Sequence, residues 1–138
     1  MSDFNTRIIE EFRANGGEVG EDFDGCALIL LHHIGAKSGT ERVTPVACFE
    51  MSNGSLVVWA SNGGAPKHPD WYHNLMAKPN VFVEFGAAGF DVTVRELSGD
   101  ERSSVWVDVV SAAPTLGAAQ KKTSRAFPML LLTRIPSR

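Results

Sequence analysis

The rest of the sequence is organised around residues 60–75, which read Ala-Ser-Asn-Gly-Gly-Ala-Pro-Lys-His-Pro-Asp-Trp-Tyr-His-Asn-Leu. It follows an apolar run at residues 56–59 that is typical of a strand. Gly63 and Gly64 free the backbone to adopt positive φ, and Pro69 suits the first position of a helix. The stretch therefore predicts a strand that ends, a flexible turn and a short helix.

This turn and helix are suited to hold a ligand. Trp71 and Leu75 lie four residues apart and share one helix face, and Pro79 after Lys78 predicts the end of the helix. The glycine turn exposes backbone N–H groups, which bind anions at the start of a helix. A loop that only bends is the alternative for a Gly-Gly pair taken alone.

The composition describes a folded and mildly acidic protein. The 138 residues are 43% hydrophobic and 21% charged, which predicts one domain over residues 1–138. The formal net charge of −3 argues against nucleic acid as the main partner. Cys26 and Cys48 form no disulfide framework, and we expect buried reduced thiols. The acidic N-terminal residues and the shortness of every apolar run predict a cytoplasmic protein.

One helix and three strands are predicted around this stretch on its N-terminal side. Phe4, Ile8 and Phe12 recur at four-residue spacing, which predicts an amphipathic helix within residues 1–17. We expect this helix to pack on the domain, and weak association with a membrane surface is the alternative. Strands are predicted at residues 26–34, 43–51 and 56–60, and a loop at residues 18–24.

A second glycine turn, residues 35–42, joins the first two of these strands. Lys37 and Arg42 flank the turn, whose free N–H groups suit an anion, although the spacing is not that of a Walker phosphate loop. A solvated hairpin turn is the alternative. Pro45 implies that the second strand is an edge there, or that a ligand replaces a ladder partner.

The four histidines do not form a metal motif. His32 and His33 are adjacent, so on a strand they point to opposite faces. His68 and His73 lie five apart with a proline between them, which is not the spacing of a helical zinc pair. We therefore expect no metal site.

The chain after residue 79 predicts three more strands and one helix. Strands are predicted at residues 80–85, 90–94 and 127–132. Ser98 and Glu101 form a capping-box pattern that opens a long helix, and Pro114 closes it before the small, polar residues 115–124. The whole pattern predicts an α+β, mainly β fold: about six mostly antiparallel strands in a small barrel flanked by three helices.

The two glycine motifs are similar to those of a known family. They read GxKSGxxRxxP at residues 35–45 and ASxGGAPxHPxWYxNL at residues 60–75. Together they resemble the deazaflavin-dependent nitroreductase family, whose members use coenzyme F420, and the similarity extends over most of the chain. The resemblance implies a split β-barrel, an FMN-binding-like fold, with the deazaflavin ring against the barrel mouth.

The resemblance also implies which residues meet the ligands. It implies that Lys37, Ser38 and Arg42 grip the acidic tail of the cofactor. The full cofactor set is Lys37, Ser38, Gly39, Arg42, Pro45, Val46, Ala60, Ser61, Asn62, Gly63, Gly64, Ala65, Pro66 and Asn74. The substrate set is Ala47, Ala113, Leu116 and Ala119. Ser61 is the catalytic candidate, as the best-placed hydroxyl for a protonation, whereas Tyr72 and Trp71 are expected to pack.

The sequence departs from the family pattern on both sides of the site. Ala36 and Asn62 stand where family members commonly carry basic residues. Ala47 stands where a tyrosine can occur, and residues 113–120 contain none of the aromatic residues that enclose a nitroaromatic substrate in some members. These small residues predict a wider and more apolar substrate pocket.

The residues and the resemblance together predict an oxidoreductase. It would transfer a hydride between F420 and an apolar conjugated acceptor, such as a quinone, an enone or a nitro compound, with the protein supplying position and electrostatics. FMN ranks below F420 as the cofactor. The alternative is a non-catalytic protein of the same fold that binds F420, a flavin or a lipid. The expected partners are a small apolar substrate, no nucleic acid and no metal, in a monomer or a homodimer.

Overall fold

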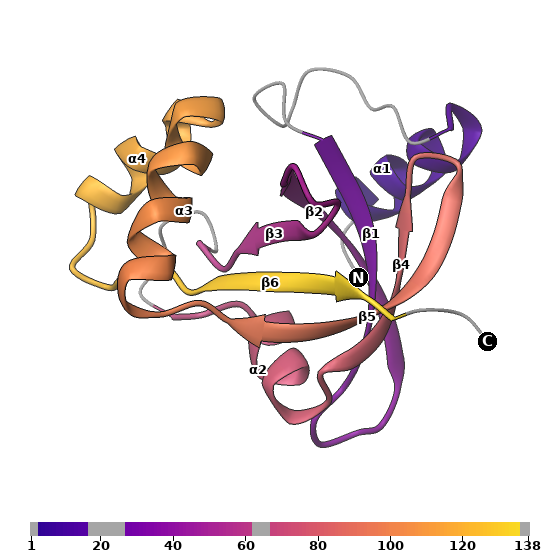
Figure 1. Ribbon diagram of the computed structural model, residues 1–138. Coiled ribbons are helices and arrows are strands. Elements are labelled where there is room, and N and C mark those ends of the chain that lie inside the picture. Colours follow the sequence, from indigo (N-terminus) through magenta and orange to yellow (C-terminus); the bar gives the residue numbers. More distant parts are fainter. Residues whose placement is uncertain (1–2, 17–26, 62–66, 136–138) are drawn as a thin grey trace.

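The computed structural model describes residues 3–16, 27–61 and 67–135. Six antiparallel strands form a closed barrel in the order β1-β2-β3-β6-β5-β4 (Figure 1). The strands are β1 (Ala27–Ile34), β2 (Glu41–Glu50), β3 (Leu56–Trp59), β4 (Asn80–Phe85), β5 (Ala88–Glu96) and β6 (Met129–Arg134). The helices are α1 (Asp3–Ala14), α2 (Asp70–Ala77), α3 (Gly99–Ala112) and α4 (Pro114–Lys121). The predicted barrel is confirmed.

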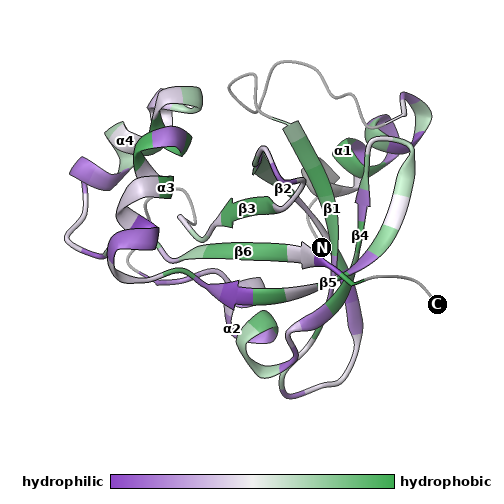
Figure 2. Cartoon of the chain, viewed as in Figure 1, coloured by the Kyte–Doolittle hydropathy of each residue, from purple (hydrophilic) through white to green (hydrophobic). Residues whose placement is uncertain are grey.

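Side chains that alternate along the strands fill the barrel. The first five residues of β1 are all hydrophobic (Figure 2). Ile29 and Leu31 point into the barrel, whereas Leu28 and Leu30 point outward. The predicted burial of this strand on both faces is confirmed, because a helix covers its outer face. Removing this apolar area from water is the main term that stabilises the fold.

Helices cover two regions of the outer barrel surface. Ile8 and Phe12 of α1 pack on the outward side chains of β1, which confirms the predicted amphipathic helix. α3 and α4 pack on outward residues of β3 and β6 in a separate cluster. Figure 1 shows these two helices at the opposite side of the molecule from α1.

The helix α2 lies at the end of the barrel where the turn between β1 and β2 is found (Figure 1). Trp71 and Leu75 are buried in the barrel cluster, as their spacing predicted. The helix ends at Ala77, with Lys78 as its C-cap before Pro79, also as predicted. The helix begins at Asp70, one residue later than predicted, and Pro69 is its N-cap with an extended ψ of 155°.

Three features of the second half differ from the prediction. Pro114 does not only close α3: it also begins a fourth helix, because its fixed φ suits a first helical position. The capping box is wrong, because Ser98 makes no side-chain cap bond and Glu101 instead pairs with Arg95 at 2.8 Å. The last strand begins at Met129, two residues later than predicted.

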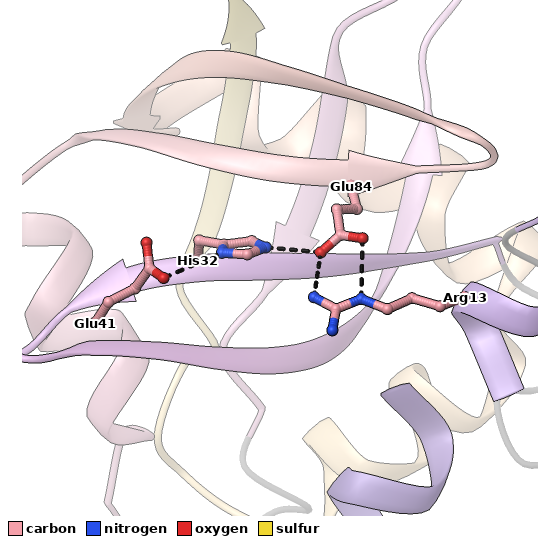
Figure 3. Close-up of polar contacts among 4 residues, drawn as sticks. All are labelled: Arg13, His32, Glu41 and Glu84. Atoms are coloured by element: carbon pink, nitrogen blue, oxygen red, sulfur yellow. Dashed lines mark hydrogen bonds and ion pairs between the residues drawn. The ribbon is translucent and has the colours of Figure 1, made fainter. Parts of the chain in front are cut away.

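A polar cluster ties α1 to the barrel wall (Figure 3). Arg13 at the end of α1 contacts Glu84 of β4 at 2.7 Å, and His32 contacts the same carboxylate oxygen at 2.7 Å. Glu41 lies 3.6 Å from the other ring nitrogen of His32. The hydrogen bond from Arg13 is the main reason that the pKa of Glu84 lies below its usual range. His32 thus points outward, opposite to His33, as strand alternation predicted.

Some predictions fall on residues outside the described ranges. These are the loop at residues 18–24, the thiol of Cys26, and the glycine-turn residues Asn62, Gly63, Gly64, Ala65 and Pro66. Among the helices that the structure describes, none combines the length and apolar character that crossing a membrane requires.

Candidate functional site

The turn between β1 and β2 is closed by its own hydrogen bonds. Gly35 donates to the carbonyl of Thr40 and accepts from Gly39, both at 2.9 Å, and Thr40 donates to the hydroxyl of Ser38 at 3.2 Å. Gly39 has a φ of 70°, which favours glycine. A Cβ on Gly35 would lie 2.4 Å from the Ser38 hydroxyl oxygen, so a side chain there would displace this hydroxyl, which accepts the bond from Thr40.

These bonds change the expected source of anion binding. The backbone N–H groups of Gly35, Ala36, Gly39 and Thr40 are engaged within the protein, so the expectation of free N–H groups is wrong for these four. The turn instead holds the exposed side chain of Lys37 on a closed backbone scaffold. Charge from side chains, rather than a backbone nest, is what this turn offers an anion.

Arg42 belongs to β2 rather than to the turn. Glu41 already pairs with Ile34, and Arg42 with His33, so the strand begins two residues earlier than predicted. The guanidinium of Arg42 is exposed near the barrel end, at the start of the strand that leaves the turn. Lys37 and Arg42 therefore supply two exposed cations at the two ends of residues 37–42.

Alternation along β2 separates two residues that were expected together at the cofactor ring. Val46 packs against the barrel interior, on the same face as Cys48. Pro45 and Ala47 lie on the opposite face, because neighbouring strand residues point to opposite sides. The edge character inferred from Pro45 fits the pairing: β3 joins β2 only over Phe49 and Glu50.

Asn74 brings the turn and α2 together. Its side chain is buried, and Oδ1 accepts a hydrogen bond from the backbone N–H of Ala36 at 2.9 Å. Its Nδ2 lies 2.9 Å from Nδ1 of His33, which is also buried. Asn74 was predicted to face the cofactor, whereas its amide in this structure binds the protein on both sides.

Arg125 holds the end of β3. Its guanidinium donates to the carbonyls of Ala60 at 3.1 Å and Ser61 at 2.7 Å, and lies 2.6 Å from Nδ1 of His68. Burial, followed by the charge of Arg125, lowers the pKa of His68, so a neutral imidazole accepts this bond. Arg125 thus connects the chain on both sides of residues 62–66.

Tyr72 extends this group toward β5. Its ring lies 4.7 Å from the His68 ring, and its hydroxyl donates to Glu96 at 2.7 Å. Burial and this hydrogen bond raise the pKa of Tyr72 to about 12. The phenol therefore stays protonated at neutral pH and packs against the barrel cluster, as expected.

The substrate-side residues lie in the outer cluster beneath α3 and α4. Ala113 and Leu116 are buried there, with 3% and 4% of their surfaces exposed, and Ala119 packs against the same cluster. Ala47 lies on the same outer face of β2 as Phe49, which also joins this cluster. The substrate set thus lies outside the barrel wall, whereas Val46 and Ala60 face its interior.

The described residues form a cavity away from these groups, and they contain no metal-binding group. A hollow of about 370 Å³ lies between the end of α1 and the β4–β5 hairpin, and none of its lining residues belongs to the predicted site. Within residues 3–16, 27–61 and 67–135, no group of three His, Cys, Asp or Glu side chains could hold a metal ion.

The candidate site is therefore the barrel end around α2. Asn74 on α2 bonds the turn that carries Lys37. Tyr72 on the same helix packs on His68, and Arg125 joins His68 to the carbonyls of Ala60 and Ser61. His33 and Arg125 were not predicted as functional residues. The position of His33, at the end of a predicted strand beside the anion turn, could have indicated its role. Arg125 makes its contacts with residues far away in the sequence, so no local pattern indicated its role.

Comparisons with known proteins agree on one family. Residues 5–134 match the family described as F420H(2)-dependent quinone reductase. An F420H(2)-dependent quinone reductase of Mycobacterium tuberculosis (strain H37Rv) is 34% identical over 127 residues, covering 89% of this chain and 85% of the relative.

Solved structures agree with these sequence relatives. A structure described as an F420-H2 dependent reductase (FDR-A) has a TM-score of 0.69 and 40% identity, and the match covers 76% of this chain and 92% of that one. Another, described as a domain-swapped dimer, has a TM-score of 0.71 and 38% identity, and the match covers 92% of both chains.

Proposed function

Because the chain belongs to the F420H(2)-dependent quinone reductase family, we propose that it is an oxidoreductase that uses F420H2 to reduce quinones. The resemblance on residues 35–45 and 60–75 pointed to the same cofactor and the same split β-barrel. The observation that carries the proposal is the barrel end around α2, where the closed turn presents Lys37 beside β2 and Arg42.

The residues at this end fit the chemistry of a cofactor with a phosphorylated, acidic tail and a flat ring. Lys37 and Arg42 offer cationic donors that suit phosphate and carboxylate groups. Val46 is only partly buried on the inner face of β2 and offers apolar surface, which suits a ring. The remaining cofactor assignments, including Ser38, Gly39 and Ser61, are part of this proposal.

The cofactor, when bound, supplies the hydride that a quinone accepts. The chain needs no nucleophile of its own for such a transfer. Its residues bind and orient the reactants: the cations fix the tail, and Arg125 sets the backbone at Ala60 and Ser61. The hydroxyl of Ser61 is the proposed proton donor on the protein side.

Removing either cation should weaken cofactor binding. Lys37→Ala and Arg42→Ala should each reduce the affinity for oxidised F420 by about 1–3 kcal/mol, the scale of a charge-assisted hydrogen bond. Both side chains are exposed, so the free energy of unfolding should change by less than about 0.5 kcal/mol. Isothermal titration calorimetry measures the first quantity and urea unfolding the second.

The matched control is Lys121→Ala, which removes the same charge from an exposed position in the last turn of α4. Added salt should weaken wild-type binding more than binding by the two variants of the site. If Lys37→Ala and Arg42→Ala bind F420 as tightly as Lys121→Ala does, the anion site lies elsewhere.

Turnover should favour quinones over nitro compounds. Ala113, Leu116 and Ala119 provide no ring stacking for a nitroaromatic, and each lost aromatic pair removes about 0.5–1.5 kcal/mol. Steady-state rates with F420H2 over menadione, cyclohexenones and nitroimidazoles test this preference. A nitroimidazole as the best acceptor would contradict it, and tight binding of F420 without turnover would favour the non-catalytic binder. Tighter binding of FMN than of F420 would contradict the assignment of F420 as the cofactor.

Two further properties are proposed on smaller grounds. Cys48 is a reduced cysteine buried in the barrel, which fits a reducing compartment such as the cytoplasm. A homodimer is proposed because a relative of 38% identity is described as a domain-swapped dimer.

A further inference from the structure

A buried polar chain crosses three elements beneath the anion turn. It starts at Thr44 of β2, whose hydroxyl lies 2.9 Å from Nε2 of His33 on β1. It continues from Nδ1 of His33 to Nδ2 of Asn74 on α2, again at 2.9 Å, and from Oδ1 of Asn74 to the backbone N–H of Ala36. His33 is 3% exposed and Asn74 is 8% exposed.

The donors and acceptors in this series of hydrogen bonds fix the direction of each bond. The backbone N–H of Ala36 can only donate, so the Asn74 oxygen faces it and the Asn74 amide N–H₂ faces His33. Nδ1 of His33 must then carry a lone pair, which places the ring proton on Nε2, where it is donated to Thr44. Every bond is satisfied only when His33 is neutral.

The surroundings of His33 favour that neutral form. Burial lowers its pKa below the ordinary value for histidine. Arg42 on β2 and His32 on β1 act in the same direction, and Asp70 on α2 opposes them. The folded state therefore binds this proton less readily than the unfolded chain, so the contribution to stability is full above about pH 6.5 and falls as the pH drops below that value.

We propose that His33 is a positioning residue for the acidic tail of the cofactor: acting through Asn74 in its neutral form, it holds the Ala36 backbone, and with it Lys37, against α2. This role rests on the proposed function. The other bonded amides of the turn, those of Gly35, Gly39 and Thr40, bond within the turn itself, whereas that of Ala36 reaches α2.

Protonation of His33 opposes this arrangement. A proton on Nδ1 would point at the amide N–H₂ of Asn74, which places two donors against each other. Rotating the amide by 180° satisfies His33, but it then turns the same N–H₂ group toward the N–H of Ala36. Either way two donors face each other, and in the rotated arrangement the turn loses its bond to the helix.

Two variants separate the roles of the histidine. His33→Phe keeps a flat ring and removes the acceptor, whereas His33→Asn offers an amide oxygen in the place of Nδ1 and does not titrate in this range. The stability control is Val109→Ala, which opens a cavity in the remote cluster under α3 and should lower stability without touching the turn.

The first measurement is hydrogen exchange at the Ala36 amide in the protein without cofactor, followed by NMR. We expect exchange in His33→Phe to be at least about tenfold faster than in wild type, and His33→Asn to restore much of the protection. Val109→Ala should resemble wild type at this amide. Equal exchange at Ala36 in His33→Phe and wild type would overturn the proposal.

The second measurement is the Kd for oxidised F420 between pH 5 and pH 8. Wild-type binding should weaken toward low pH by about tenfold more than binding by His33→Asn, a comparison that cancels the titration of the cofactor itself. Parallel pH profiles would overturn the role of the neutral form. If wild type fails to bind F420 at any pH, the proposed function and the role toward the tail both fail, while loss of protection at Ala36 in His33→Phe would still support the hold on the turn.

Discussion

Replacing Arg125 by methionine is expected to lower the free energy of unfolding by about 2–4 kcal/mol and to weaken F420 binding at least tenfold. The substitution keeps an unbranched apolar stem but removes the donors for the carbonyls of Ala60 and Ser61. Ala60 is fully buried, so its carbonyl would lose its Arg125 donor where water is excluded. The backbone that is proposed to line the cofactor would then be free to shift.

Urea unfolding and a fluorescence titration with F420 measure the two effects. Arg102→Met is the matched control, because Arg102 also donates to a carbonyl, that of Phe127 at 2.7 Å, but from α3. It should cost stability without a specific loss of binding. Arg125→Lys keeps the charge but not the planar fork, so it should recover only part of the loss. Equal F420 affinity in Arg125→Met and Arg102→Met would remove Arg125 from the site.

Replacing Trp71 by alanine is expected to destabilise the protein by about 3–5 kcal/mol, as for other buried tryptophans. Trp71 packs in the barrel cluster beside Leu75 and anchors α2 to the barrel end. The helix carries Asn74, so cofactor binding should also fall, as a consequence of the lost anchor. Thermal and urea unfolding measure the change in stability.

Met76 on the same helix provides the control for Trp71. Its side chain is 39% exposed, so Met76→Ala should change the free energy of unfolding by less than about 0.5 kcal/mol. A different result for Trp71→Ala would change the role assigned to Trp71. If Trp71→Ala kept wild-type stability and lost only F420 binding, the indole would contact the cofactor rather than the core.

Some helix boundaries could be predicted from local sequence patterns, and others could not. The spacing of Ile8 and Phe12 identified α1, and Pro79 identified the end of α2, because periodicity and proline geometry act within a few residues. The capping box at Ser98 failed because Arg95 on the neighbouring strand competes for the Glu101 carboxylate. α4 was not predicted, because its small residues carry a weak pattern and Pro114 suits the end of one helix as well as the start of another.

Local patterns in the sequence were enough to define the barrel and the two segments proposed to hold the cofactor. Alternation of apolar residues defines strands, and glycine and proline define turns, through contacts between near neighbours. The motifs at residues 35–45 and 60–75 are therefore recognisable in the sequence alone, and so is the family that they resemble.

The contacts that hold these segments in place depend instead on tertiary structure. Arg125 meets Ala60 because β3 pairs with β6, and His33 meets Asn74 because α2 lies against the end of β1. These contacts join residues 65 and 41 positions apart. Their geometry follows from closure of the barrel, which no local spacing encodes, because a buried polar group takes whichever partner the packed core brings within hydrogen-bonding distance.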